Sequence, residues 1–273
     1  APVYRRPTKR PRSLATAQRL ALRSLPQPKD WTKTLTELLR SPTIASKSPV
    51  FEQYDHMVQT NTVVLPGRAD AAVLRLKGTR KWLAATIDGN GRYCALDPYE
   101  GGRLAVAEAA RNLVCVGARP LAVTDCLNFR SPEDPEVMWQ FKECVRGIAE
   151  ACRAFKTPVT GGNVSFYNEG PRGAIDPTPV IGMVGLFEAE GPRPKAEHRG
   201  LRPPASGRRP ITASFKDEGD AIIVVGVTRE ELGGSEYLAC IHGIVAGAPP
   251  ARFLPGERAL IDALLESIGG SHV

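Results

Sequence analysis

The feature that most constrains the fold is an alternation of helical and strand-like sequence between residues 104 and 188. Residues 104–116 place apolar side chains near helical spacing, and Gly117 ends that pattern. Residues 134–155 carry a second helical face, marked by Val137, Phe141, Val145, Ile148 and Cys152. Extended segments are predicted at 120–127, 157–165 and 178–188. Together these patterns predict an alternating α+β unit.

Two polar segments end neighbouring strands of this unit. One is Gly161-Gly162-Asn163-Val164-Ser165, and the other is Thr124-Asp125-Cys126-Leu127-Asn128. Adjacent glycines let a ligand approach the backbone and expose N–H groups to phosphate oxygens. Asp125 and Asn163 could supply oxygen ligands to a hard cation. The pair of segments therefore predicts a phosphate and metal site.

Ordinary turn chemistry is the alternative explanation for the same residues. Asp125 could cap a turn after a strand, and Gly162-Asn163 could form a tight turn. Asp88-Gly89 and Asp97-Pro98 are better explained as turns than as ligands, and His56 as a hydrogen-bonded structural residue. The sequence contains no Walker pattern and no arrangement of Ser, His and Asp typical of a hydrolase, so neither class is favoured.

The segments before residue 104 predict smaller elements. Residues 31–39 form a short amphipathic pattern that ends before Pro42, which predicts a helix. Residues 71–77 and 82–87 are both strand-like and predict a hairpin joined at 78–80. Gly101-Gly102 is expected to open the helix that follows.

The positive charge of the chain is concentrated at its N-terminus. Residues 1–40 hold ten Lys or Arg against two Asp or Glu, whereas residues 41–273 hold 26 against 27. Nucleic-acid-binding proteins usually spread basic residues over a face, so nucleic acid is not favoured as a partner. The basic arm is interpreted as a solvated linker or a partner-binding extension.

The C-terminal part predicts a linker and a partial second domain. Residues 189–210 are rich in Pro, Gly and Arg and predict a linker. Beyond it, 220–226 predicts a buried strand, and Gly233-Gly234-Ser235 is expected to open a helix. The predicted organisation is a basic leading segment with a short helix, a main domain, a linker and a partial C-terminal domain, at 1–40, 41–188, 189–210 and 211–273.

Cysteine usage and hydropathy predict a cytoplasmic protein with no membrane contact. The six cysteines form no Cys-x-x-Cys pair and lie mostly in apolar segments, which favours reduced, buried thiols over disulfides or zinc. No run of about 18 apolar residues occurs, so no membrane-spanning helix is expected.

An ordered series of segments resembles the phosphoribosylformylglycinamidine synthase family. The resemblance is dense over residues 38–188 and looser over 211–250. The matching segments include Tyr-Asp-His-Met-Val-Gln within 47–59, Asp-Gly-Asn-Gly-Arg-Tyr-Cys at 88–94, Ala-Glu-Ala-Ala-Arg-Asn at 107–112, Thr-Asp-Cys-Leu-Asn-Phe at 124–129, Pro-Glu-Val-Met-Trp-Gln at 135–140 and Gly-Asn-Val-Ser at 162–165.

This resemblance implies a ligase of purine biosynthesis. In the implied reaction, ATP with Mg²⁺ activates the amide oxygen of formylglycinamide ribonucleotide, and ammonia from a glutaminase partner replaces that oxygen to give the amidine. The implied fold is similar to aminoimidazole ribonucleotide synthetase, with an α+β domain that pairs through its strands into a barrel and an α/β domain behind it. The chain resembles the C-terminal half, so the N-terminal half is an expected partner.

The resemblance also assigns roles to four residues. Asp125 and Gly162 are expected to contact ATP, Asn163 to bind Mg²⁺ and Ser165 to contact the substrate. No catalytic residue is expected in this chain. Arg130 departs from the family pattern, which usually has Gly there. The alternative hypothesis is a non-catalytic module that pairs with itself or with the other half through exposed strands.

Overall fold

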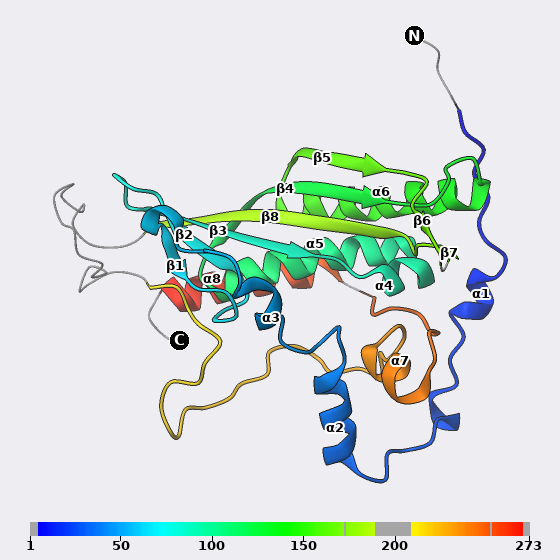
Figure 1. Ribbon diagram of the computed structural model, residues 1–273, viewed down its shortest axis with the longest axis horizontal. Helices are drawn as coiled ribbons and strands as arrows, with labels where there is room; N and C mark the ends of the chain where they lie inside the picture. The colour runs from blue at the N-terminus through cyan, green and yellow to red at the C-terminus, as the bar shows by residue number, and fades with distance from the viewer. Residues whose placement is uncertain (1–4, 172, 189–208, 252, 270–273) are drawn as a thin grey trace.

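The computed structural model describes residues 5–171, 173–188, 209–251 and 253–269. Its centre is a mixed sheet of six strands in the order β1-β2-β3-β8-β4-β5 (Figure 1). The strands are β1 (Thr62–Val64), β2 (Ala72–Arg75), β3 (Lys81–Asp88), β4 (Arg119–Asn128), β5 (Val159–Ser165) and β8 (Thr178–Glu188). A separate small ribbon pairs β6 (Glu169–Gly170) with β7 (Gly173–Ala174). The predicted α+β class is confirmed.

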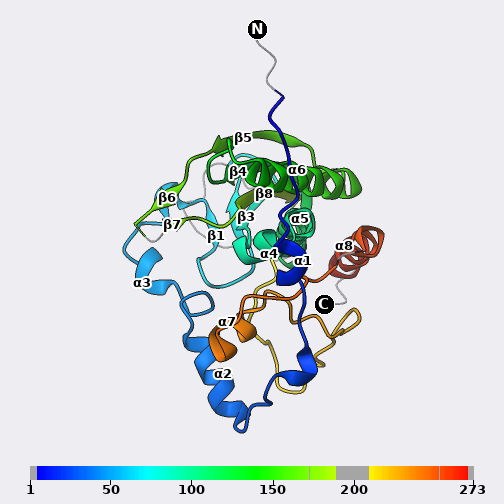
Figure 2. The ribbon, with the colours of Figure 1, turned by 90° about the vertical axis from the view of Figure 1, so that its right-hand side faces the viewer.

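Helices α5, α6 and α8 lie on one side of the sheet (Figure 2). The α-helices of the described residues are α1 (Leu14–Ala17), α2 (Trp31–Arg40), α3 (Ser48–Phe51), α4 (Gly91–Leu96), α5 (Pro98–Cys115), α6 (Pro135–Phe155), α7 (Glu236–His242) and α8 (Leu254–Gly269). Two short 3₁₀ turns occur at η1 (Leu22–Ser24) and η2 (Val58–Thr60). The helix-facing side of the sheet and the helices share one apolar core.

The sheet follows from strand sequences that alternate between its two faces. In β8, Ile181, Met183 and Phe187 are buried against the helices, whereas Val184 between them is exposed on the other face. Strands β3 and β4 pair antiparallel with the two edges of β8. Strand β5 lies parallel to β4, and α6 provides the crossover that a parallel pair requires. The predicted hairpin of β2 and β3 is confirmed.

Helix α5 begins earlier than the sequence predicts. Its N-cap is Asp97, whose carboxylate accepts hydrogen bonds from the backbone N–H groups of Tyr99 and Glu100. Gly101 and Gly102 therefore lie inside the helix and do not open it. A Cβ on Gly101 would stand 2.5 Å from the sulfur of Cys94, and one on Gly102 would stand 2.5 Å from the carbonyl oxygen of Cys144. Both glycines serve close helix packing, which explains why the expectation of a helix start was wrong.

Helix α6 matches its predicted bounds but differs in one buried position. Asp134 caps its first turn, and Val137, Ile148 and Cys152 are buried as expected. Val145 is exposed, because Cys144 takes the buried position beside it. The helix ends at Lys156, which adopts the left-handed conformation usually filled by glycine.

The basic N-terminal arm contacts the body of the protein. The backbone N–H of Lys9 donates to the carbonyl oxygen of Pro135 at 2.9 Å, and the Lys9 ammonium pairs with Glu136 at 3.2 Å. The Arg10 guanidinium lies over the Trp139 ring at 5.9 Å from its centroid. Residues 9 and 10 therefore dock on the first turns of α6 and do not form a solvated linker. The predicted helix at 31–39 is confirmed as α2.

The predicted buried strand at 220–226 is wrong. Residues 221–225 pair with no other strand in the described chain, and Ile223 and Val224 are 78% and 82% exposed. A strand needs partners for its backbone groups, and the described residues after the sheet offer none. The helix expected after Gly233-Gly234 is confirmed as α7, with Ser235 as its N-cap. The predicted linker at 189–210 lies almost wholly outside the described residues.

Helix α8 joins the core of the main sheet. Leu254 and Ile261 are buried in the same apolar cluster as α5 and α6. Arg111 of α5 and Glu257 of α8 form an ion pair of 2.8 Å. Helix α8 thus packs on the main domain. The division that places residues 211–273 in a partial C-terminal domain stays a prediction.

The cysteines only partly match their prediction. All six are free, but Cys115 and Cys240 are exposed, because each lies on the outward side of its helix. In the described part of the chain, no helix combines the length and apolar character needed to cross a membrane.

Candidate functional site

The two polar segments singled out in the sequence lie side by side at the end of the sheet. In the parallel register of β4 and β5, Asp125 is opposite Gly162, and Asn128 is opposite Ser165. Strand β5 is the edge of the sheet, and almost all of its residues are exposed. Its outward backbone groups have no strand partner in the described residues. This edge can therefore offer N–H groups to a ligand.

Asp125 and Gly162 form a close pair on the helix-facing side. A Cβ on Gly162 would stand 2.2 Å from Asp125 Oδ1 and 2.7 Å from the Asp125 carbonyl oxygen, so only glycine fits without a shift. The carboxylate faces α6, where it also raises the pKa values of Cys144 and Cys152 as a minor cause. Burial raises the pKa of Asp125 above its ordinary value. No hydrogen bond or ion pair to this carboxylate is found within the described residues.

Asn163 and Ser165 point to the opposite face of the sheet. Successive side chains in a strand alternate between faces, so residues 163 and 165 are on the side away from Gly162 and Asp125. Asp125 and Asn163 therefore cannot bind one cation together, as the sequence pattern suggested. The structure brings together Asp125 with Gly162, and Asn163 with Ser165. A ligand that contacts both pairs must cross the edge at Gly161-Gly162, where a Cβ on Gly161 would meet nothing within 4 Å.

Ser165 is held in place by Asn168, a residue that the sequence analysis missed. The Ser165 hydroxyl donates to Asn168 Oδ1 at 3.2 Å, and Asn168 Nδ2 donates to the Ser165 carbonyl oxygen at 2.8 Å. The same Nδ2 also donates to the carbonyl oxygen of Phe129 at 3.0 Å. The turn places Tyr167 in the left-handed region. An Asn in a turn three residues after Ser165 was the available signal.

The other polar residues of the shortlist have structural partners. Asp88 accepts hydrogen bonds from Asn112 at 2.7 Å and from Thr86 at 2.8 Å, although burial still raises its pKa. Asn128 donates to the carbonyl oxygens of Cys126 and Thr178, both at 3.1 Å. Asp97 is a helix cap, not the predicted turn. His56 is exposed, and its ring Nδ1 lies 3.1 Å from the carbonyl oxygen of Tyr54.

The residues at this edge could bind Mg²⁺ only if phosphate groups or water supplied most of its ligands. Mg²⁺ prefers oxygen ligands and commonly takes several from phosphates and water. Within the described residues, no group of three or more His, Cys, Asp or Glu is arranged to hold a metal ion. Asn163 is an exposed residue on the glycine-containing edge strand, so its amide oxygen could supply one ligand to an ion carried by a nucleotide.

Arg130 fits its loop without backbone strain. It follows buried Phe129, has no positive φ, and its carbonyl oxygen accepts from the N–H of Tyr167 at 3.3 Å. A glycine is therefore not needed at this position for conformational reasons.

Comparison with known proteins identifies relatives of the whole chain and of its sheet. Residues 68–187 match the family described as AIR synthase related protein, N-terminal domain. The phosphoribosylformylglycinamidine synthase subunit PurL of Moorella thermoacetica is 54% identical over 267 residues, which is 98% of this chain and 34% of that protein. The PurL subunit of Alkaliphilus metalliredigens is 50% identical over 273 residues, 100% of this chain and 35% of that protein. The chain spans about a third of the length of these relatives.

Solved structures of Thermotoga maritima PurL are also similar to the chain in sequence. The complex with ATP is 36% identical, with a TM-score of 0.46, and covers 53% of this chain and 24% of that one. The complex with FGAR is 38% identical, with a TM-score of 0.46, and covers 53% of this chain and 23% of that one.

Proposed function

We propose that the chain is part of a PurL-type subunit of phosphoribosylformylglycinamidine synthase and that it supplies part of that enzyme's nucleotide and substrate site. The observation that carries the proposal is the close pair of Asp125 and Gly162 beside Asn163 and Ser165 at the exposed edge of the sheet. The proposed reaction is the ATP-dependent conversion of formylglycinamide ribonucleotide to the amidine, with ammonia derived from glutamine by a glutaminase partner.

Each residue has a distinct role in this proposal. Asp125 and Gly162 contact the nucleotide on the helix-facing side of the edge, Asn163 binds Mg²⁺ on the other side, and Ser165 contacts the ribonucleotide substrate. Bound Mg²⁺ would neutralise charge on the transferred phosphoryl group. The contribution of this chain is to position the groups, since exposed N–H groups and fixed polar side chains act by electrostatic stabilisation. The other half of the subunit would complete the site.

Calorimetric titration of ATP tests the nucleotide site and separates the roles of its residues. ATP is titrated into the chain with Mg²⁺ and, separately, with EDTA. We expect Asn163→Ala to weaken binding about tenfold with Mg²⁺ and to change nothing with EDTA, since about 1.4 kcal/mol of metal contact is lost. Gly162→Val should weaken binding in both series, because its side chain fills the space beside Asp125.

Gln53→Ala is the matched control, because it removes an exposed amide that is outside the sheet. It should bind ATP as the unaltered chain does. Absence of heat with the unaltered chain would contradict nucleotide binding by this part of the protein. Equal Mg²⁺-dependent binding by the Asn163→Ala chain would contradict the metal role alone.

The open face of the sheet favours pairing as a second candidate function. Ile87 is 76% exposed there, and the exposed Val184 and Leu74 lie on the same face, opposite Ala85 and Leu83 of the same strand as Ile87. Exposed apolar side chains on one sheet face are typical of a surface covered by a partner. In this proposal the face associates with the other half of the subunit or with a second copy of the chain.

Sedimentation of the chain tests this pairing. The expected result is a concentration-dependent dimer that Ile87→Glu converts to a monomer, because a carboxylate would be buried in the interface. Glu52→Gln, an exposed change outside the sheet, is the control. A monomer at all concentrations would contradict association with a second copy. Association with the other half of the subunit would then be tested by sedimentation of a mixture of the chain and that half.

A further inference from the structure

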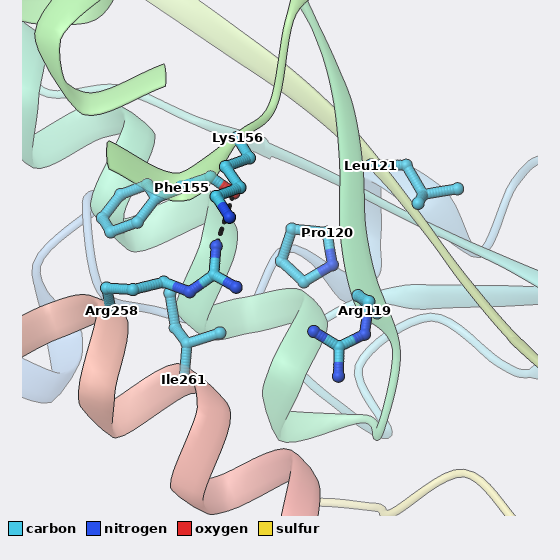
Figure 3. A pocket seen from close by; sticks show the side chains of 7 residues that line it. All are labelled: Arg119, Pro120, Leu121, Phe155, Lys156, Arg258 and Ile261. Carbon is cyan, nitrogen blue, oxygen red and sulfur yellow. Dashed lines mark hydrogen bonds between the residues drawn. The ribbon is translucent and has the colours of Figure 1, made fainter. Parts of the chain in front are cut away.

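A pocket lies at the amino end of β4, away from the candidate site. It has a volume of about 220 Å³ and lies between the start of β4, the end of α6 and the inner side of α8 (Figure 3). Its lining residues are Arg119, Pro120, Leu121, Phe155, Lys156, Arg258 and Ile261. Asp125 lies six residues further along β4, about 20 Å at the usual rise of a strand. The pocket is thus separate from the proposed nucleotide site.

Three of the lining residues are cationic, and each comes from a different element. Arg119 begins β4, Lys156 follows α6, and Arg258 lies on α8 (Figure 3). The floor is apolar, because Phe155 and Ile261 are only 4% and 3% exposed. Like charges gathered around one hollow repel each other unless an anion lies between them. This arrangement is typical of a site for a small oxyanion.

The nearby acidic and carbonyl groups leave part of this charge unbalanced. Asp262 accepts from Arg258 Nε at 2.7 Å and from Arg258 Nη2 at 3.2 Å, and it lies 3.5 Å from Arg119, so one carboxylate is shared by two guanidinium groups. Arg258 also donates to the carbonyl oxygen of Phe155 at 3.0 Å, which satisfies one carbonyl at the negative end of α6. No ion pair of Lys156 is found within the described residues.

Lys156 adds an independent sign of function. Its φ of 59° and ψ of 39° place it in the left-handed region, where glycine is the usual residue after a helix. Compared with glycine, lysine at this position costs backbone strain but places a cation at the mouth of the pocket. The lysine side chain is therefore the feature to test.

We propose that this pocket binds a phosphate group, either inorganic phosphate or a small phosphate monoester. The cations supply the charge-assisted hydrogen bonds that phosphate oxygens accept. The volume lies below the range of about 300–1,000 Å³ that is usual for sites of larger ligands, so a whole nucleotide does not fit. The site is independent of the proposed function, because it needs neither ATP nor Mg²⁺.

Nuclear magnetic resonance titration of the full chain tests the pocket. Inorganic phosphate and glycerol 3-phosphate are added separately, with chloride adjusted to keep the ionic strength constant. The expected result is saturable shifts of the backbone amides of Lys156 and Arg258. Tighter binding of glycerol 3-phosphate would assign the site to monoesters, and equal or weaker binding would assign it to inorganic phosphate.

Two variants and a control make the test specific. Lys156→Gly and Arg119→Gln should each lower the affinity about tenfold, the size expected when one charge-assisted contact is lost. Lys156→Gly should not lower the melting temperature, because glycine suits the left-handed position. Lys142→Gln removes an exposed cation on α6 and should change nothing. Unsaturable shifts with both anions, or equal weakening by Lys142→Gln, would overturn the proposal.

Discussion

Asp125 and Glu236 are both carboxylates in partly buried surroundings, yet their pKa values shift in opposite directions. Glu236 accepts hydrogen bonds from the Cys240 thiol at 2.8 Å and the Ser41 hydroxyl at 2.5 Å, and it pairs with Arg92. These contacts lower its pKa to about 2. Burial alone raises the pKa of Asp125. The charge of Glu236 is thus balanced within the fold, whereas that of Asp125 has no such balance in the described residues.

This difference separates a structural carboxylate from a candidate functional one. Glu236 connects α7 with α4 and with the end of α2, so its partners come from three elements. Asp125 stands beside a glycine at an exposed edge. A desolvated charge without a partner is unfavourable and is found more often at functional sites. The comparison therefore supports a ligand contact at Asp125.

The largest expected effect is at Glu236. Glu236→Ala should destabilise the chain by about 3 kcal/mol, because it leaves Arg92 without its partner in a partly buried position. Urea unfolding at pH 7 measures the change. Glu230→Ala, on the exposed segment before α7, should shift the midpoint little. A small effect at Glu236 would show that the two carboxylates differ less than their contacts suggest.

The same contrast predicts the response to acid. The folded pKa of Glu236, about 2, lies below its ordinary value of 4.5, so its stabilisation is complete above pH 4.5 and is lost as the pH falls toward 2. The stability difference between the unaltered chain and Glu236→Gln should therefore shrink over that interval. Urea unfolding at pH 6, 4 and 3 measures it. A difference that stays constant would exclude the charged form as the cause.

A smaller effect is expected when the space beside Asp125 is filled. Gly162→Ala should destabilise by about 1–3 kcal/mol, because its Cβ overlaps Asp125 Oδ1 and the Asp125 carbonyl oxygen. Gly161→Ala is a matched control on the same strand, since its Cβ would meet no atom within 4 Å. Thermal unfolding compares the two. Equal melting temperatures would mean that Asp125 can move away from the added Cβ. The claim that only glycine fits beside Asp125 would then be wrong.

The sequence predicts the secondary-structure elements better than it predicts which strands pair and which side chains share a face. The bounds of α6, the hairpin of β2 and β3 and the strand β8 follow from local periodicity, which a single segment contains. Segment 220–226 has an equally apolar sequence but no strand partner, and partners are not a local property. Likewise, the sequence places Asp125 and Asn163 at neighbouring strand ends, but only the register shows that they face opposite sides.

The smallest expected effect is a gain in stability at Asp125. Asp125→Asn removes a desolvated charge, so it should stabilise the chain at pH 7 by less than about 1 kcal/mol, since the group remains partly solvated. The folded pKa is raised, so the unfavourable effect is complete above that pKa and disappears as the pH falls and the carboxyl takes up a proton. Unfolding at pH 7 and pH 3 should therefore show a gain only at pH 7.

If the same variant also weakens ATP binding, stability and function oppose each other at this residue, as expected for a charge retained for a ligand. A loss of stability at pH 7 would instead give Asp125 a structural role like that of Glu236.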